Sequence, residues 1–169
     1  MSRYSARITW QQHDGDDFTG LRYSRVHRWD FDGGAAIAGS PSPQNVRAPY
    51  SDAAAVDPEE ALLAAISSCH MLCFLYRAAR AGYEVASYDD AAEAVLEATA
   101  PGATPWMTRA ILRPSIRFSG TKIPDDAAVA ALHEAAHGDC YIAHSVKTAI
   151  QVAGSWEHIL RENGAGGGN

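Results

Sequence analysis

Cysteine is scarce in this chain: only three of its 169 residues are cysteines, Cys69, Cys73 and Cys140. Small secreted domains stapled by disulfides carry more cysteines, and in even number. The count therefore excludes a disulfide framework. Any disulfide that forms here is expected to be transient and catalytic.

Positive charge and long apolar runs are scarce as well. The chain has 14 Lys and Arg against 20 Asp and Glu, which gives a net charge of −6. Because nucleic-acid binders present a basic face, we expect no nucleic-acid partner. No stretch reaches the roughly 18–20 apolar residues of a membrane span, and residues 1–12 lack the apolar segment of a secretory signal. We therefore expect a cytoplasmic protein with no membrane partner.

Apolar and charged residues are present in the proportions of a folded domain, at 47% and 20% of the chain. These fractions exclude general disorder. The length fits one domain with a sizeable core. We predict a single domain over residues 1–160, followed by a Gly-rich, disordered tail at residues 161–169.

Hydrophobic periodicity predicts strands, two helices and one long loop. The loop, residues 39–55, is rich in Ser, Pro and Ala, and loops of this length are often functional. The helices are expected at residues 57–81 and 124–138. The strands are expected at residues 5–12, 21–31, 35–38, 85–98, 106–119 and 146–159. This order of elements fits an α+β domain.

The first helix has a strong start signal. Asp57 can cap it, Pro58 suits the first helical position, and Glu60 completes a capping box. Gly82 is expected to end it. Because the helix is apolar on most sides, we expect it to be buried at the centre of the molecule.

Composition and spacing leave the chemistry of the cysteines open. Cys69 lies in the middle of the first helix, where a cysteine is usually a small buried hydrophobe. Cys140 follows Gly138 in a segment that can begin a short helix, and the dipole of that helix would lower the thiol pKa. Cys140 is therefore either a reactive thiol or an incidental loop cysteine. We interpret Cys73, one helical turn from Cys69, as a packing residue, because a bond between the two would distort the backbone.

Two segments resemble those of a known family. Residues 57–69 (DPEEALLAAISSC) match Asn/Asp-Pro-Glu followed by an apolar helix of small residues and a cysteine, and residues 135–140 (AAHGDC) resemble the segment that carries a second cysteine. Over about residues 20–155 the chain is similar to the OsmC/Ohr family of thiol-dependent organic hydroperoxide reductases. The resemblance implies an α+β, OsmC-like fold, with antiparallel sheets wrapped around two central helices in an intertwined homodimer. The active sites would lie at the subunit interface.

The resemblance also implies a peroxidase mechanism that needs no cofactor. Cys69 would attack the distal oxygen of an organic hydroperoxide, giving a sulfenic acid and an alcohol. Cys140 would condense with the sulfenic acid to form a disulfide. A dithiol reductant of the dihydrolipoyl type would then restore both thiols.

The resemblance further implies that an arginine stabilises the Cys69 thiolate and that Glu59 holds that arginine. A guanidinium suits this role, because it stays charged and offers forked donors to both groups. From the residues alone, Glu59 is equally well explained as a favourable acid in the first helical turn. Arg25 is our choice for the arginine, ahead of Arg47 and Arg28. Each of the three is otherwise a solvated surface charge.

The chain departs from the best-known family members next to both cysteines. Tyr141 and Ile142 follow the second cysteine, where many members have a proline and a nearby serine. His70 follows the first, where an aromatic residue is usual. We expect these changes to affect substrate range and rate.

A zinc hydrolase is the first alternative, because His133-Glu134-x-x-His137 matches the H-E-x-x-H pattern. The two histidines would bind the metal and Glu134 would act as the base, with His144 or Cys140 as a third ligand. The second alternative is a non-catalytic member of the same fold that binds a small apolar ligand.

Overall fold

The computed structural model describes residues 1–159, so the predicted tail lies outside the described residues. The chain divides into two compact units, residues 1–62 and the remainder from residue 63. Helix α1 (Pro58–Arg80) begins in the first unit and continues in the second. Each unit is described by itself below.

The first unit is a three-stranded antiparallel sheet of order β1-β2-β3, made of β1 (Ala6–Thr9), β2 (His27–Phe31) and β3 (Ala36–Gly39). The predicted return strand after the glycine turn is confirmed. The predicted strand at residues 21–31 is too long, because Leu21 has a positive φ of 61°, which no extended strand allows. Arg25 consequently lies in the loop that precedes β2 and not in a strand.

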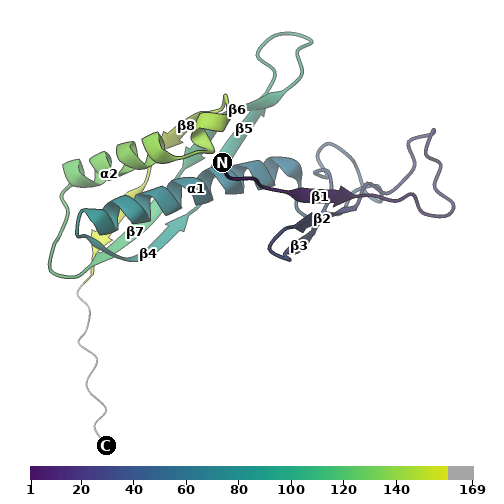
Figure 1. Ribbon diagram of the computed structural model, residues 1–169. Coiled ribbons are helices and arrows are strands. Elements are labelled where there is room, and N and C mark those ends of the chain that lie inside the picture. The colour runs from purple at the N-terminus through teal and green to yellow at the C-terminus, as the bar shows by residue number, and fades with distance from the viewer. Residues whose placement is uncertain (160–169) are drawn as a thin grey trace, which may run out of the picture. The chain divides into compact units, whose positions relative to one another are not determined.

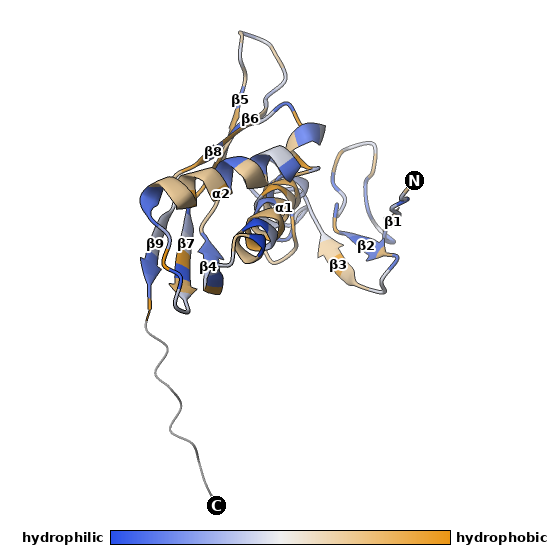
Figure 2. Ribbon diagram, turned by 60° about the vertical axis from the view of Figure 1, so that its left-hand side comes forward, coloured by the Kyte–Doolittle hydropathy of each residue, from blue (hydrophilic) through white to orange (hydrophobic). Residues whose placement is uncertain are grey.

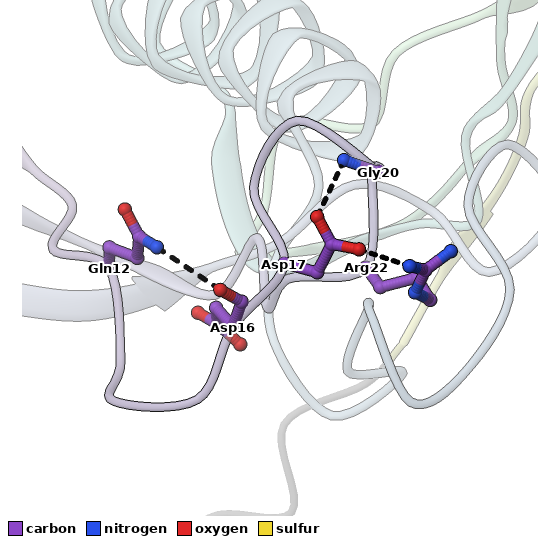
Figure 3. A network of polar contacts seen from close by, with 5 residues as sticks. All are labelled: Gln12, Asp16, Asp17, Gly20 and Arg22. Carbon is purple, nitrogen blue, oxygen red and sulfur yellow. Dashed lines mark hydrogen bonds and ion pairs between the residues drawn. The ribbon is translucent and has the colours of Figure 1, made fainter.

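Asp17 holds that loop in shape (Figure 3). Its side chain accepts a hydrogen bond from the backbone of Gly20 at 2.8 Å and forms an ion pair with Arg22. The backbones of Asp17 and Arg22 also bond to each other in both directions, at 3.0 and 2.9 Å. Gly20 is required here, because a Cβ would lie 2.3 Å from the Asp17 carboxylate. Nearby, Gln12 donates to the Asp16 carbonyl at 3.3 Å.

The second unit contains three extended segments, each divided into two strands that belong to different sheets. One sheet has the order β4-β7-β9 and the other β5-β6-β8. The predicted antiparallel pairing is only partly right, since β8 lies parallel to β6 and β9 parallel to β7. The strands are β4 (Glu84–Asp90), β5 (Glu93–Glu97), β6 (Trp106–Leu112), β7 (Pro114–Ser119), β8 (Ala149–Val152) and β9 (Ser155–His158).

Each of the three long strands predicted from periodicity is divided into two. The divisions fall at Pro114 or beside residues that lie next to it in space. Proline has no N–H to give to a sheet. The preceding residue, Arg113, donates its N–H to the Asp90 carboxylate at 2.6 Å, outside the strand ladder. Gly154 fits against Pro114, where a Cβ would lie 2.5 Å from the proline carbonyl oxygen. These contacts let each segment turn from one sheet to the other.

Both helices pack on the β4-β7-β9 sheet (Figures 1 and 2). The capping box of α1 is confirmed: Glu60 donates its N–H to Asp57 at 2.7 Å, and the Glu60 carboxylate accepts from the Asp57 N–H at 3.3 Å. Helix α2 (Asp126–Asp139) is capped by Asp125, which accepts from Ala128. The core joins side chains of α1, β7 and α2: Phe74, Ala78, Ile116, Phe118, Val129, Leu132 and Ala136.

In the single chain, α1 is covered on one face only, although we expect it at the centre of the molecule. Its buried residues form one stripe, Ile66, His70, Phe74 and Ala78, because only one face of the helix packs on the core. Among residues 1–159, α1 is the one helix long and apolar enough to cross a membrane by length and composition. Core helices of globular proteins pass the same test.

Candidate functional site

Three thiols meet between α1 and α2 in the second unit. Cys69 and Cys73 lie one turn apart on α1, and Cys140 directly follows the last residue of α2. The Cys69 thiol lies close enough to those of Cys73 and Cys140 to raise the pKa of both. All three cysteines are free. The structure therefore brings together the two cysteines that the resemblance paired, 71 positions apart in the chain, and adds a third.

Cys140 is 1% exposed, and burial raises the pKa of its thiol to about 11, with a further contribution from the contact with Cys69. The expectation of a lowered pKa at a helix start is wrong. Cys140 lies at the C-terminal end of α2, and the short 3₁₀ helix that follows begins only at Ala143. The Ala143 N–H donates to the Cys140 sulfur at 3.4 Å. At neutral pH Cys140 therefore keeps its proton.

Cys73 is half-buried and packs beside the core, as predicted. Burial is the main cause that raises the pKa of its thiol, followed by the neighbouring Cys69. Two charged groups, Arg77 and Asp139, act on it in opposite directions. Cys73 is thus also a protonated thiol at neutral pH, next to Cys69.

A pair of histidines lies on the buried side of α1. His70 Nε2 and His133 Nδ1 are 3.0 Å apart, and the rings stack with centroids at 5.3 Å. His70 is 1% exposed, and burial lowers its pKa to about 4. Sequence reasoning named both histidines without pairing them. The spacing Ile66-His70-Phe74 was the available signal, since it places His70 on the core stripe of the helix.

The histidine pair removes support from the zinc alternative. His133 Nδ1 faces His70, while Glu134 and His137 are exposed. His144 bonds instead to the Gly138 carbonyl at 2.8 Å. Within residues 1–159 no group of three or more His, Cys, Asp or Glu side chains is arranged to hold a metal ion.

Arg25 and Glu59 line one pocket in the first unit, with a volume of about 550 Å³. The Arg25 guanidinium lies 4.1 Å from the Tyr23 ring centroid and donates to the carbonyls of Tyr23 and Leu21 at 3.0 and 3.4 Å, instead of pairing with Glu59. The remaining lining is mainly apolar and aromatic: Ile8, Trp10, Phe18, Tyr23, His27, Pro41 and Pro58.

The two other candidate arginines lie elsewhere in the first unit. Arg28 forms an exposed ion pair with Asp30 at 2.7 Å, and Arg47 is exposed in the long loop. Neither lines the pocket that contains Arg25 and Glu59. Of the three predicted arginines, Arg25 alone shares a pocket with the predicted acid.

Two helices cover a mixed sheet, and two cysteines lie close together, one on α1 and one directly after α2. These features define the class of protein: an α+β thiol protein without a disulfide framework. The family model described as OsmC-like protein matches residues 51–154. The chain belongs to this OsmC-like family.

Solved structures of the same fold agree with the family. An OsmC-like protein of unknown function from Vibrio cholerae is 44% identical, with 92% of this chain and 100% of that chain covered and a TM-score of 0.88. An organic hydroperoxide resistance protein from Elizabethkingia anophelis is 16% identical over 94% and 98% of the two chains, with a TM-score of 0.58. OhrB of Bacillus subtilis is 16% identical over 90% and 98%, with a TM-score of 0.51. A comparison with curated proteins found no match.

Proposed function

We propose that this protein is a thiol-dependent peroxidase that reduces organic hydroperoxides to alcohols. The observation that carries the proposal is that Cys69 on α1 and Cys140 at the end of α2 lie close enough for Cys69 to raise the pKa of the Cys140 thiol. The family includes organic hydroperoxide resistance proteins, which points to a role in peroxide defence. We assign the attack on the peroxide to Cys69, which is partly exposed, as Cys73 is, while Cys140 is buried.

The reaction has two steps on the protein. The Cys69 thiolate attacks the distal peroxide oxygen, the O–O bond breaks, and the alkoxide leaves as an alcohol after taking a proton. Cys69 is then a sulfenic acid. The Cys140 thiol attacks that sulfur, an S–S bond forms as the S–O bond breaks, and the thiol proton leaves with the hydroxide as water. Because its raised pKa keeps Cys140 protonated at neutral pH, the thiol must lose its proton as it attacks, and the departing hydroxide takes that proton.

Reduction of the disulfide completes the cycle. A small dithiol of the dihydrolipoyl type would attack one of the two sulfurs and return both cysteines to thiols by exchange. No cofactor is required for any of these steps, because the peroxide supplies the oxidising equivalents and the dithiol the reducing ones.

Arg25 remains the proposed partner of the Cys69 thiolate, with Glu59 as the acid proposed to hold that arginine. They line a pocket whose other walls are mainly apolar and aromatic, which suits the organic part of a hydroperoxide. A guanidinium beside that pocket can hold a peroxide oxygen or a thiolate.

We further propose that the active protein is a homodimer. Leu72 and Tyr76 on α1 are 61% and 60% exposed in the single chain, although the helix is mainly apolar. A second copy would cover this face and remove apolar surface from water.

The test is oxidation of the reduced protein with cumene hydroperoxide, followed by thiol counting and mass spectrometry. We expect loss of the Cys69 and Cys140 thiols, with Cys73→Ser behaving as the wild type. Cys140→Ser should stop at the Cys69 sulfenic acid, and Cys69→Ser should not react. Unchanged thiols in the wild type would sink the proposal. Oxidation without turnover by any dithiol would instead favour a non-catalytic, ligand-binding member of the family.

A further inference from the structure

Arg77 and Asp139 form an ion pair beside the three thiols. The guanidinium of Arg77 makes two bonds to the carboxylate, Nε to Oδ2 at 2.5 Å and Nη2 to Oδ1 at 2.7 Å. This fork geometry is the most directional form of a charged contact. The side chains are 43% and 36% exposed, so solvent screens them in part.

Arg77 lies on the same face of α1 as Cys69. Cys69, Cys73 and Arg77 are spaced by four residues on α1 and therefore share one face of the helix. Asp139 is the last residue of α2 and precedes Cys140 directly. The Arg77–Asp139 pair thus joins this face of α1 to the end of α2, next to the neighbouring Cys69 and Cys140.

The end of α2 has few other polar ties. Apart from the backbone bonds within α2, the other hydrogen bonds of residues 137–145 in the described structure are local to that segment. The backbone N–H of Cys140 donates to the His137 carbonyl at 3.3 Å, and the Cys140 carbonyl accepts from the His144 N–H at 3.2 Å. The Ser145 hydroxyl donates to the Tyr141 carbonyl at 2.7 Å. Arg77 is therefore the α1 side chain that is hydrogen-bonded to this segment.

We propose that Arg77 is a positioning residue, which holds the Cys140 thiol against Cys69 through Asp139 and so promotes closure of the disulfide. The proposal rests on the two-cysteine mechanism given above. It assigns Arg77 to the second step, in which the Cys140 thiol displaces hydroxide from the Cys69 sulfenic acid and water leaves. Attack of Cys69 on the peroxide does not involve Arg77.

The Arg77–Asp139 ion pair, here called the clamp, should also protect Cys69 from further oxidation. A sulfenic acid that waits for its partner can meet a second peroxide molecule, which oxidises it to a sulfinic acid while the peroxide is reduced to an alcohol. Rapid closure of the disulfide prevents this loss. A weaker clamp should therefore raise the fraction of sulfinic acid at Cys69 without changing how fast Cys69 first reacts.

The first experiment measures the stability of the disulfide without any peroxide. The protein, in a Cys73→Ser background, is equilibrated in mixtures of reduced and oxidised dithiothreitol, and the Cys69–Cys140 disulfide is quantified by mass spectrometry. Arg77→Gln and Asp139→Asn should each lower the equilibrium constant for closure by about two- to fivefold, the range for a well-formed exposed ion pair. The exchanged pair Arg77→Asp with Asp139→Arg should recover most of the loss.

Arg80→Gln is the matched control, since Arg80 is a basic residue in the same last turn of α1. It should leave the equilibrium unchanged. Circular dichroism checks that each variant keeps the fold. If either Arg77→Gln or Asp139→Asn fails to fold, the other still tests the proposal. Equal constants for Arg77→Gln, Asp139→Asn and Arg80→Gln would overturn the proposal.

The second experiment treats the same variants with excess cumene hydroperoxide. We expect a two- to fivefold rise in Cys69 sulfinic acid for Arg77→Gln, with an unchanged rate of first oxidation. An unchanged sulfinic fraction would contradict the clamp. Failure of the wild type to react with the peroxide would count against the proposed function alone, because the dithiothreitol experiment decides the clamp separately.

Discussion

The buried histidine pair makes a strong prediction about acid stability. His70 is 1% exposed, and its pKa in the folded protein is about 4. In the unfolded chain a histidine has a pKa of about 6.5. Between these two pH values the His70 imidazole is protonated in the unfolded chain and neutral in the folded protein. The free energy of unfolding must therefore fall as the pH falls.

The size of the effect follows from the two pKa values. A difference of about 2.5 units corresponds to about 3 kcal/mol once the pH is below 4. At pH 5 the loss relative to pH 7 is about 2 kcal/mol from His70. His133 adds to it with the same sign, because burial lowers its pKa as well. The contribution of neutral His70 to the free energy of unfolding is complete above about pH 6.5 and is lost as the pH falls from about 6.5 to about 4.

The measurement is urea unfolding followed by circular dichroism at pH 7 and pH 5, at one protein concentration. His70→Phe keeps a flat ring for the stack with His133 and removes the titrating group. Its free energy of unfolding should fall by about 2 kcal/mol less than that of the wild type between these pH values. His13→Asn, which changes an exposed residue of the first unit, serves as the control. Identical pH dependence in the wild type and His70→Phe would refute the reasoning.

Three further predictions concern packing, chemistry and assembly. Phe74→Ala removes a fully buried ring from the core and should cost about 3–5 kcal/mol in urea unfolding; a loss below about 1 kcal/mol would contradict the described core. Arg25→Gln should slow oxidation of Cys69 by cumene hydroperoxide by about tenfold or more in stopped flow, while Arg47→Gln should not; the reverse order would move the role to Arg47. Tyr76→Asp puts a charge on the exposed face of α1 and should shift the proposed dimer toward monomer in sedimentation analysis, which Glu134→Gln on exposed α2 surface should not do.

Local signals in the sequence predicted the helices well. The capping box at Asp57 and Glu60 forms as expected, and Gly82 follows the end of α1 with a φ of +78°. Such signals act over three or four residues, so they need no knowledge of the rest of the fold. The long strands were less well predicted, because alternation of apolar residues continues across Pro114 while the hydrogen bonding does not.

Burial was the property that sequence reasoning placed least well. The apolar composition of α1 predicts a helix at the centre of the molecule, and in the single chain only one stripe of it is buried. Periodicity states which face of a helix is apolar and does not state what covers it. For Cys140, proximity to a short helix predicted a lowered pKa, while its burial raises the pKa to about 11. That error has another cause, since Cys140 lies at the end of α2 and the short helix begins only at Ala143.

The sequence by itself determined the helix boundaries of α1, the family to which the chain belongs and the two cysteines that carry the proposed chemistry. These depend on short motifs whose meaning is local. Only the tertiary structure decided that Cys73 joins Cys69 and Cys140, that His70 pairs with His133, and that Arg77 holds Asp139. Each of the last two contacts joins residues about sixty positions apart. Such pairs form because packing of α2 beside α1 brings them together, and no local pattern in the chain encodes that packing.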